Sequence, residues 1–201
     1  MEHTLSLSPA LGFTTQEYFE YLLLANPGEE VFKKVMAEKE IFSFCYKVNV
    51  AKKTLPHITI ANFLAKESME DTLIKWTNKI ISNQYSFEVM LNNFSGFPLS
   101  NTIYARVQNH EPFKQLATSL KTIDEYVRSN GFPRAMLINH PHMTIAKRLQ
   151  PNVYEKALKD YSRKTFNISF AVNELILLKR QNTYDTCKQV AVFKLAPSYK
   201  A

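Results

Sequence analysis

The sequence predicts an α+β fold. Two features carry the prediction: helices alternate with strands in an order that favours antiparallel pairing, and one strand–helix–strand theme is used twice. With 201 residues, the chain can bury a substantial core as one domain, or as two small lobes that share a core. We expect residues 1–14 to form an N-terminal arm and residues 15–201 to form a single domain.

The first half of the chain opens with a strand and a helix. Residues 18–25 are rich in aromatic side chains and leucine, which is typical of a buried strand. Pro27 begins a helix that runs to about residue 39, with Glu29 and Glu30 in its first turn, where the helix dipole favours acidic side chains. The remaining elements predicted in this half are strands over 42–50, 56–63 and 85–91 and a helix over 69–82.

The second half begins after a turn-rich stretch, residues 92–100. Residues 113–130 have the spacing of a long amphipathic helix, which Gly131 and Pro133 end. The other elements predicted in this half are strands over 102–108, 142–147, 166–171, 175–180 and 189–195 and a short helix over 152–161.

Positive charge is concentrated in the second half of the chain. Residues 1–100 carry 9 Lys and Arg against 11 Asp and Glu, a net charge of −2. Residues 101–201 carry 16 against 7, a net charge of +9, so the overall +7 comes from this half. A field of this sign attracts phosphate-bearing partners, although many basic proteins bind no nucleic acid. Nucleic acid or a nucleotide is therefore a candidate partner.

The N-terminal region lacks the features of a secretory signal. Residues 1–12 have no basic start and no long apolar run, and the apolar stretch 18–25 is too short to span a bilayer. The two cysteines, Cys45 and Cys187, make neither a disulfide framework nor a metal-ligand spacing. These observations predict a cytoplasmic protein with no membrane partner.

A six-residue motif occurs twice in the chain. Residues 56–61 read PHITIA and residues 141–146 read PHMTIA, so five of the six positions are identical and the sixth exchanges one apolar residue for another. Chance matches around five histidines are expected on the order of once in 10⁴ such sequences. Duplication or a shared structural demand explains the repeat better than chance does.

Strand geometry gives each copy of the motif one polar face. Successive side chains of a strand alternate between two faces. His57 and Thr59 therefore point one way, His142 and Thr144 share the equivalent face, and the apolar residues between them point into a core. If the two strands lie side by side about a pseudo-twofold axis, two imidazoles and two hydroxyls meet in one groove.

This set of groups suits phosphoryl chemistry. A neutral histidine accepts a proton from water or a hydroxyl nucleophile, and a protonated histidine donates one to the leaving oxygen. An ordinary pKa near 6.5 lets both states coexist at neutral pH. The hydroxyls of Thr59 and Thr144 can bind the non-bridging phosphate oxygens and hold phosphorus in line with the nucleophile. The expected chemistry requires no metal ion and no cofactor.

Other interpretations of the histidines stay open. A single histidine beside a proline in a strand is usually structural, whereas a pair with matching hydroxyls favours function. Paired histidines also occur in zinc sites, which need a third ligand, and neither motif brings a close Cys, Asp or Glu in register. A metal site is therefore not expected. ATP dependence is not expected either, because the sequence has no Gly-rich phosphate loop.

The paired His-x-Thr motifs resemble the signature of the 2H phosphoesterase superfamily, and specifically of its bacterial 2′-5′ RNA ligase-like (LigT-like) group. The similarity extends over about residues 18–195 and includes the Gly-Phe-Pro segments at 96–98 and 131–133. The resemblance implies a bilobed, duplicated fold in which two antiparallel sheets face a central groove, with helices on the outside.

The same resemblance implies that His57, Thr59, His142 and Thr144 form the catalytic site. Members of the family hydrolyse nucleoside 2′,3′-cyclic phosphates or make and break 2′-5′ RNA linkages. The resemblance further implies that His57 is the general acid that protonates the leaving ribose oxygen, and that His142 is the general base that takes a proton from water. The reverse assignment fits the sequence equally well.

Three further residues are candidates for binding substrate. Arg148 has the strand parity of His142, and family members often carry a basic residue after the second motif. Lys147 takes that role if the strand twists or bulges. Tyr184 resembles a tyrosine that related proteins place near the groove. An ordinary solvated basic pair and a loop aromatic are the alternatives, and His140 is expected at the rim.

The sequence therefore predicts a monomeric phosphoesterase that acts without a metal on a 2′,3′-cyclic or 2′-5′ phosphodiester of RNA or of a nucleotide. The principal alternative is a non-catalytic module that binds an RNA end or a nucleotide in the same groove. A purely structural duplicated domain is a third interpretation. It predicts that His57 and His142 are buried and do not face each other.

Overall fold

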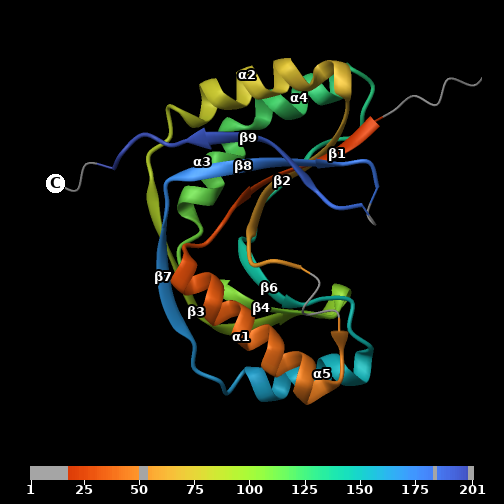
Figure 1. The fold of residues 1–201 in the computed structure, drawn as a ribbon, viewed down its shortest axis with the longest axis vertical. Helices are drawn as coiled ribbons and strands as arrows, with labels where there is room; N and C mark the ends of the chain where they lie inside the picture. Colours follow the sequence, from red (N-terminus) through yellow and green to blue (C-terminus); the bar gives the residue numbers. More distant parts are fainter. Residues whose placement is uncertain (1–17, 50–53, 183–184, 199–201) are drawn as a thin grey trace, which may run out of the picture.

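The strands form two antiparallel sheets, as the computed structural model shows for residues 18–49, 54–182 and 185–198. The first sheet has the order β5-β2-β1-β8-β9 and the second the order β6-β4-β3-β7. The first comprises β1 (Tyr18–Ala25), β2 (Ile58–Lys66), β5 (Met136–Leu137), β8 (Glu174–Arg180) and β9 (Lys188–Lys194). The second comprises β3 (Phe87–Phe97), β4 (Thr102–Val107), β6 (His142–Ala146) and β7 (Asn167–Val172). The sheets face each other in a C-shaped molecule, which confirms the predicted fold class (Figure 1).

Helices cover the outside of the C (Figure 1). On the first sheet, α2 (Glu70–Ile81) contacts β9, while α3 (Glu111–Ser119) and α4 (Lys121–Ser129) contact β2. On the second sheet, α1 (Glu29–Tyr46) contacts β6 and β7, and α5 (Pro151–Tyr161) contacts β3 and β4. Short 3₁₀ turns at Glu67–Met69 and Pro98–Ser100 complete the elements of the described residues.

The alternation expected for both motifs is present. Ile58 and Ile60 on β2 and Met143 and Ile145 on β6 are completely buried. The residues between them are partly exposed on the opposite face of each strand. The apolar residues of the motifs therefore anchor the two strands in the core, and the polar residues face the space between the sheets.

The strand predicted over residues 42–50 is wrong, because α1 continues to Tyr46. Its alternating aromatic residues imitate a strand, but Phe42 is buried whereas Phe44 is 86% exposed. Phe42 continues the helical spacing of Val31 and Val35 on the buried side. The helix ends at Lys47, whose φ of 53° lies in the left-handed region.

Three smaller differences come from local backbone geometry. The helix predicted over 113–130 is two helices, since the backbone at Leu120 (φ −82°, ψ 0°) is not helical. The turn predicted over 92–100 is mostly strand, because β3 runs to Phe97 through an irregularity near Asn93, which has a φ of 58°. The two-residue strand β5 has no signal in the sequence.

No helix within the described ranges is long and apolar enough to cross a membrane. The arm expected over residues 1–14 lies outside the described residues.

Candidate active site

The two His-x-Thr motifs lie on different sheets and face each other. His57 directly precedes β2 in the first sheet, and His142 is the first residue of β6 in the second. The two strands contact each other without pairing in one ladder, so the motifs oppose each other across the space between the sheets. This arrangement contradicts a structural domain in which the two histidines are buried apart.

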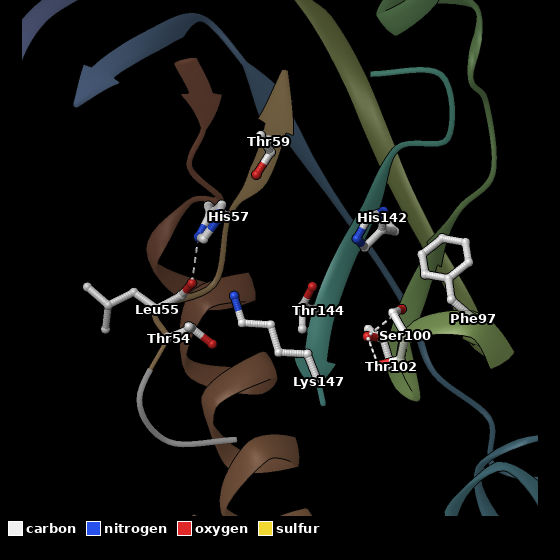
Figure 2. Close-up of a pocket in the computed structure, with 10 residues that line it drawn as sticks. All are labelled: Thr54, Leu55, His57, Thr59, Phe97, Ser100, Thr102, His142, Thr144 and Lys147. Atoms are coloured by element: carbon white, nitrogen blue, oxygen red, sulfur yellow. Dashed lines mark hydrogen bonds between the residues drawn. The ribbon is translucent and has the colours of Figure 1, made fainter. Parts of the chain in front are cut away.

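A cavity of about 280 Å³ lies between the motifs. Its lining comes from both sheets and from the segment before β2: Thr54, Leu55, His57, Thr59, Phe97, Ser100, Thr102, His142, Thr144 and Lys147. Figure 2 shows His57 and His142 on opposite walls, with the Lys147 ammonium reaching into the space between His57 and Thr144. All four residues expected to be catalytic therefore line a single cavity.

Both imidazoles are held by the same kind of hydrogen bond. His57 Nδ1 lies 2.8 Å from the carbonyl oxygen of Leu55, and His142 Nδ1 lies 2.9 Å from that of His140. Each partner is two residues before its histidine. Because a carbonyl oxygen only accepts, each Nδ1 carries the hydrogen and donates it. In the neutral ring, Nε2 is then the proton acceptor, so both histidines are set to exchange a proton at Nε2.

Burial lowers the pKa of both histidines below the usual value of 6.5. For His57, the hydrogen bond to Leu55 partly opposes burial, and the positive charges of Lys39, Lys147 and a protonated His142 lower the pKa further. For His142, burial again dominates and its bond to the backbone of residue 140 opposes it. Both imidazoles are therefore mainly neutral at pH 7 in the free protein.

The lowered pKa values predict an acidic optimum for kcat/KM. This parameter reports the pKa values of the free enzyme, and a pair that needs one neutral and one protonated histidine is most active midway between its two pKa values. Since both lie below 6.5, the optimum of kcat/KM is expected below pH 6.5. The negative charge of a bound phosphodiester is expected to raise both pKa values, so the optimum of kcat is expected at a higher pH than that of kcat/KM. Steady-state rates from pH 4.5 to 9 measure both, and a kcat/KM optimum above pH 7 contradicts the assignment.

An aromatic wall supports His142. The rings of Phe97 and Tyr104 stack with their centroids 4.2 Å apart, and both contact the imidazole of His142, at 4.9 Å and 5.2 Å. The hydroxyl of Tyr104 lies 3.3 Å from Nε2 of His140, so the His140 ring lies beside the two aromatic rings. The carbonyl of the same residue accepts the hydrogen bond from His142 Nδ1. These contacts restrict the orientation of the His142 imidazole.

The expected basic residues separate into one that lines the cavity and one that does not. The parity argument for Arg148 required the strand to continue, but β6 ends at Ala146 and Arg148 has a φ of 56°. The chain turns there, and the Arg148 amide donates to the carbonyl of Ser100. Lys147 lines the cavity and Arg148 does not. Tyr184 lies outside the described residues.

Several residues of the site had no signal in the sequence. Phe97, Ser100 and Thr102 reach the cavity from the end of β3 and the start of β4, and Thr54 and Leu55 reach it from the segment before His57. Only tertiary contacts identify them. Within the described part of the chain, no three His, Cys, Asp or Glu side chains are grouped so that they could hold a metal ion.

Comparison with known proteins supports the same family. The profile of the 2′-5′ RNA ligase superfamily matches residues 39–183. A Staphylococcus aureus (strain Newman) protein named "Putative phosphoesterase" is 28% identical over 143 residues, which cover 70% of this chain and 81% of that protein.

Solved structures show the same fold. E. coli LigT complexed with 3′-AMP has a TM-score of 0.64 at 16% identity, over 89% of this chain and 99% of LigT. E. coli LigT complexed with NADP+ has a TM-score of 0.61 at 18% identity, over the same shares of the two chains. These identities establish the fold alone, whereas the profile covers most of the sequence. The chain belongs to the 2′-5′ RNA ligase superfamily.

Proposed function

We propose that this protein is a phosphodiesterase that hydrolyses a 2′,3′-cyclic or 2′-5′ phosphodiester of RNA or of a nucleotide by two-histidine acid–base catalysis, without a metal ion. One observation carries the proposal: His57 and His142 face one cavity, and each is held at Nδ1 by a backbone carbonyl. This leaves both Nε2 atoms for proton transfer. A group that only binds phosphate does not need two imidazoles held in the same tautomer.

The proposed reaction uses one histidine at each end of the displacement. Nε2 of His142 takes a proton from water as the water oxygen bonds to phosphorus. The bond from phosphorus to the leaving ribose oxygen breaks, and a protonated His57 donates its Nε2 proton to that oxygen. The hydroxyls of Thr59 and Thr144 and the ammonium of Lys147 hold the non-bridging oxygens and stabilise their charge. Proton exchange with solvent restores both imidazoles.

The size and charge of the site suit a phosphate attached to a nucleoside. A cavity of about 280 Å³ holds the phosphate and adjoining ribose, while Phe97 in its lining provides aromatic surface beside them. The E. coli LigT structures contain 3′-AMP and NADP+. Ligands of that class are therefore the first to test on this chain.

A non-catalytic binding module is the rival interpretation, and single-turnover kinetics separates the two. An RNA oligonucleotide ending in a 2′,3′-cyclic phosphate and a dinucleotide with a 2′-5′ linkage are each incubated with excess protein. The proposal predicts product from at least one of them, identified as a 2′- or 3′-phosphate or as a cleaved linkage. Saturable binding of both substrates with no product supports the binding module instead.

Lys147 is expected to contribute mainly to phosphate binding. A hydrogen bond to a charged group is worth about 1.5–3 kcal/mol, so Lys147→Met is expected to lower kcat/KM roughly 10- to 100-fold. Arg148→Met is the matched control, because Arg148 is the next residue in the chain and lies outside the cavity lining. We expect it to change kcat/KM less than about threefold, as is usual for a surface substitution. Equal losses in the two variants contradict the assignment of Lys147.

A further inference from the structure

A lysine is fully buried on the inner side of α1. Lys39 has 0% of its surface exposed, and it continues the helical spacing of the buried residues Val31 and Val35. An apolar side chain at this position would satisfy the packing of α1 against the second sheet. A buried ammonium is costly unless it is paired and hydrogen-bonded, so a lysine at this position needs polar partners inside the fold.

The Lys39 ammonium donates hydrogen bonds to a residue in each half of the site. Nζ donates to the hydroxyl of Thr54 at 3.2 Å and to the carbonyl oxygen of Ile145 at 3.3 Å. Thr54 lines the cavity three residues before His57. Ile145 is on β6, the strand that carries His142. One side chain therefore connects the segment that leads to the first histidine with the strand that carries the second.

The charge of Lys39 acts unequally on the two histidines. Burial, and then the positive charge of Lys147 at the end of β6, lower the pKa of Lys39 to about 8, so at pH 7 the ammonium is still mostly protonated. Lys39 in turn lowers the pKa of His57, as does Lys147. The groups that lower the pKa of His142 are its own burial and His140. The two motifs thus have similar sequences but different electrostatic surroundings.

We propose that Lys39 is a positioning residue that prepares His57: its ammonium fixes the segment before His57 against β6, and its buried charge adds to the burial of His57 in favouring the neutral imidazole until a phosphate group enters the cavity. The negative charge of phosphate offsets the two lysines, and His57 then takes up a proton from solvent. In this way the general acid becomes protonated when there is a substrate to receive the proton. The second step rests on the proposed function, because it requires the cavity to bind phosphate; the first does not.

The first step is tested in the absence of any ligand. NMR titration of the histidine ring carbons measures the pKa of His57 in the wild type, Lys39→Met and Lys39→Gln. Methionine removes the charge and the hydrogen bonds, whereas glutamine removes the charge and keeps a donor. Both variants are expected to raise the pKa of His57, because each removes a positive charge that disfavours the imidazolium. The pKa of His142 is expected to change less.

Lys33→Met is the matched control. Lys33 is on the same helix but is exposed and paired with Glu29 at 2.5 Å, so this variant is expected to leave both histidines unchanged. A folded Lys39 variant with an unchanged His57 pKa overturns the proposal. An equal change at His142 also overturns it, because it indicates a general disturbance of the fold.

Titration of the wild type with inorganic phosphate tests the second step, and it needs no Lys39 variant. Saturating phosphate is expected to raise the pKa of His57 more than that of His142. Bound phosphate that leaves His57 unchanged overturns the proposed proton uptake. If phosphate does not bind at all, the proposed function fails together with the uptake step, whereas the ligand-free comparison of His57 still tests the effect of Lys39 separately.

Discussion

Replacing His57 or His142 with alanine is expected to lower the kcat/KM of a 2′,3′-cyclic phosphodiester by roughly 10²- to 10⁴-fold, the usual contribution of a placed general acid or base. Both side chains project from the polar face of their strands and are partly exposed, so neither variant leaves a large hole in the core. The fold is expected to stand, which thermal unfolding followed by circular dichroism checks. Steady-state kinetics gives the loss of activity for each variant.

The double variant provides a sharper test of the pair. Residues that act as one unit have effects far from additive, so removing both histidines is expected to cost little more than removing one. His110→Ala is the matched control, because His110 is close to His140, with ring centroids 4.9 Å apart, but does not line the cavity. If His110→Ala loses as much activity as His57→Ala, the loss reports disturbed packing and the assignment of His57 is wrong.

Gly96→Ala is expected to cause the largest loss of stability of any substitution considered. A methyl group built on Gly96 would lie 2.6 Å from Oη and 2.9 Å from Cε2 of Tyr154, and 3.0 Å from Cδ1 of Leu158. Overpacking of this kind costs about 2 kcal/mol of the free energy of unfolding, which lowers Tm by about 4–8 °C in a chain of this size. Because Phe97 follows directly and contacts His142, we also expect activity to fall.

Two substitutions separate the steric cause from others. Gly28→Ala is the matched control, since its methyl group would meet nothing within 4 Å, and it is expected to leave Tm nearly unchanged. Tyr154→Phe removes a buried hydroxyl that has no hydrogen-bond partner among the described residues, so it is expected to cost little by itself. In the Gly96→Ala background it should restore part of the lost stability. An unchanged Tm for Gly96→Ala contradicts this account of the packing.

The central part of the site was predictable because it depends on local periodicity. Strand alternation alone places His57 with Thr59 and His142 with Thr144, and the core then fixes which face is polar. The repeat indicated that the two copies act together. Their arrangement across two sheets was predictable only through resemblance to a family, because alternation within a strand does not specify which strand it faces.

The remainder depends on contacts between distant segments. Lys39 contacts Thr54 of the cavity lining and Ile145 of β6 because α1 packs against β6, and its place in the helix is otherwise that of a core residue. The support of His142 by Phe97 and Tyr104 needs two neighbouring strands. Arg148 lies outside the cavity lining for a related reason, since β6 ends at Ala146 and the left-handed backbone of Arg148 interrupts the alternation of side chains. None of these features produces a periodic pattern of residues in the sequence.

The two-histidine mechanism is tested by hydrolysis, in excess EDTA, of an RNA oligonucleotide ending in a 2′,3′-cyclic phosphate. The wild type, His57→Ala and His142→Ala are compared under single-turnover conditions. We expect the wild type to convert the cyclic end to a phosphomonoester at the same rate with and without EDTA, and each variant to be nearly inactive although folded. Conversion that EDTA abolishes, or that survives the loss of either histidine, would contradict the two-histidine mechanism.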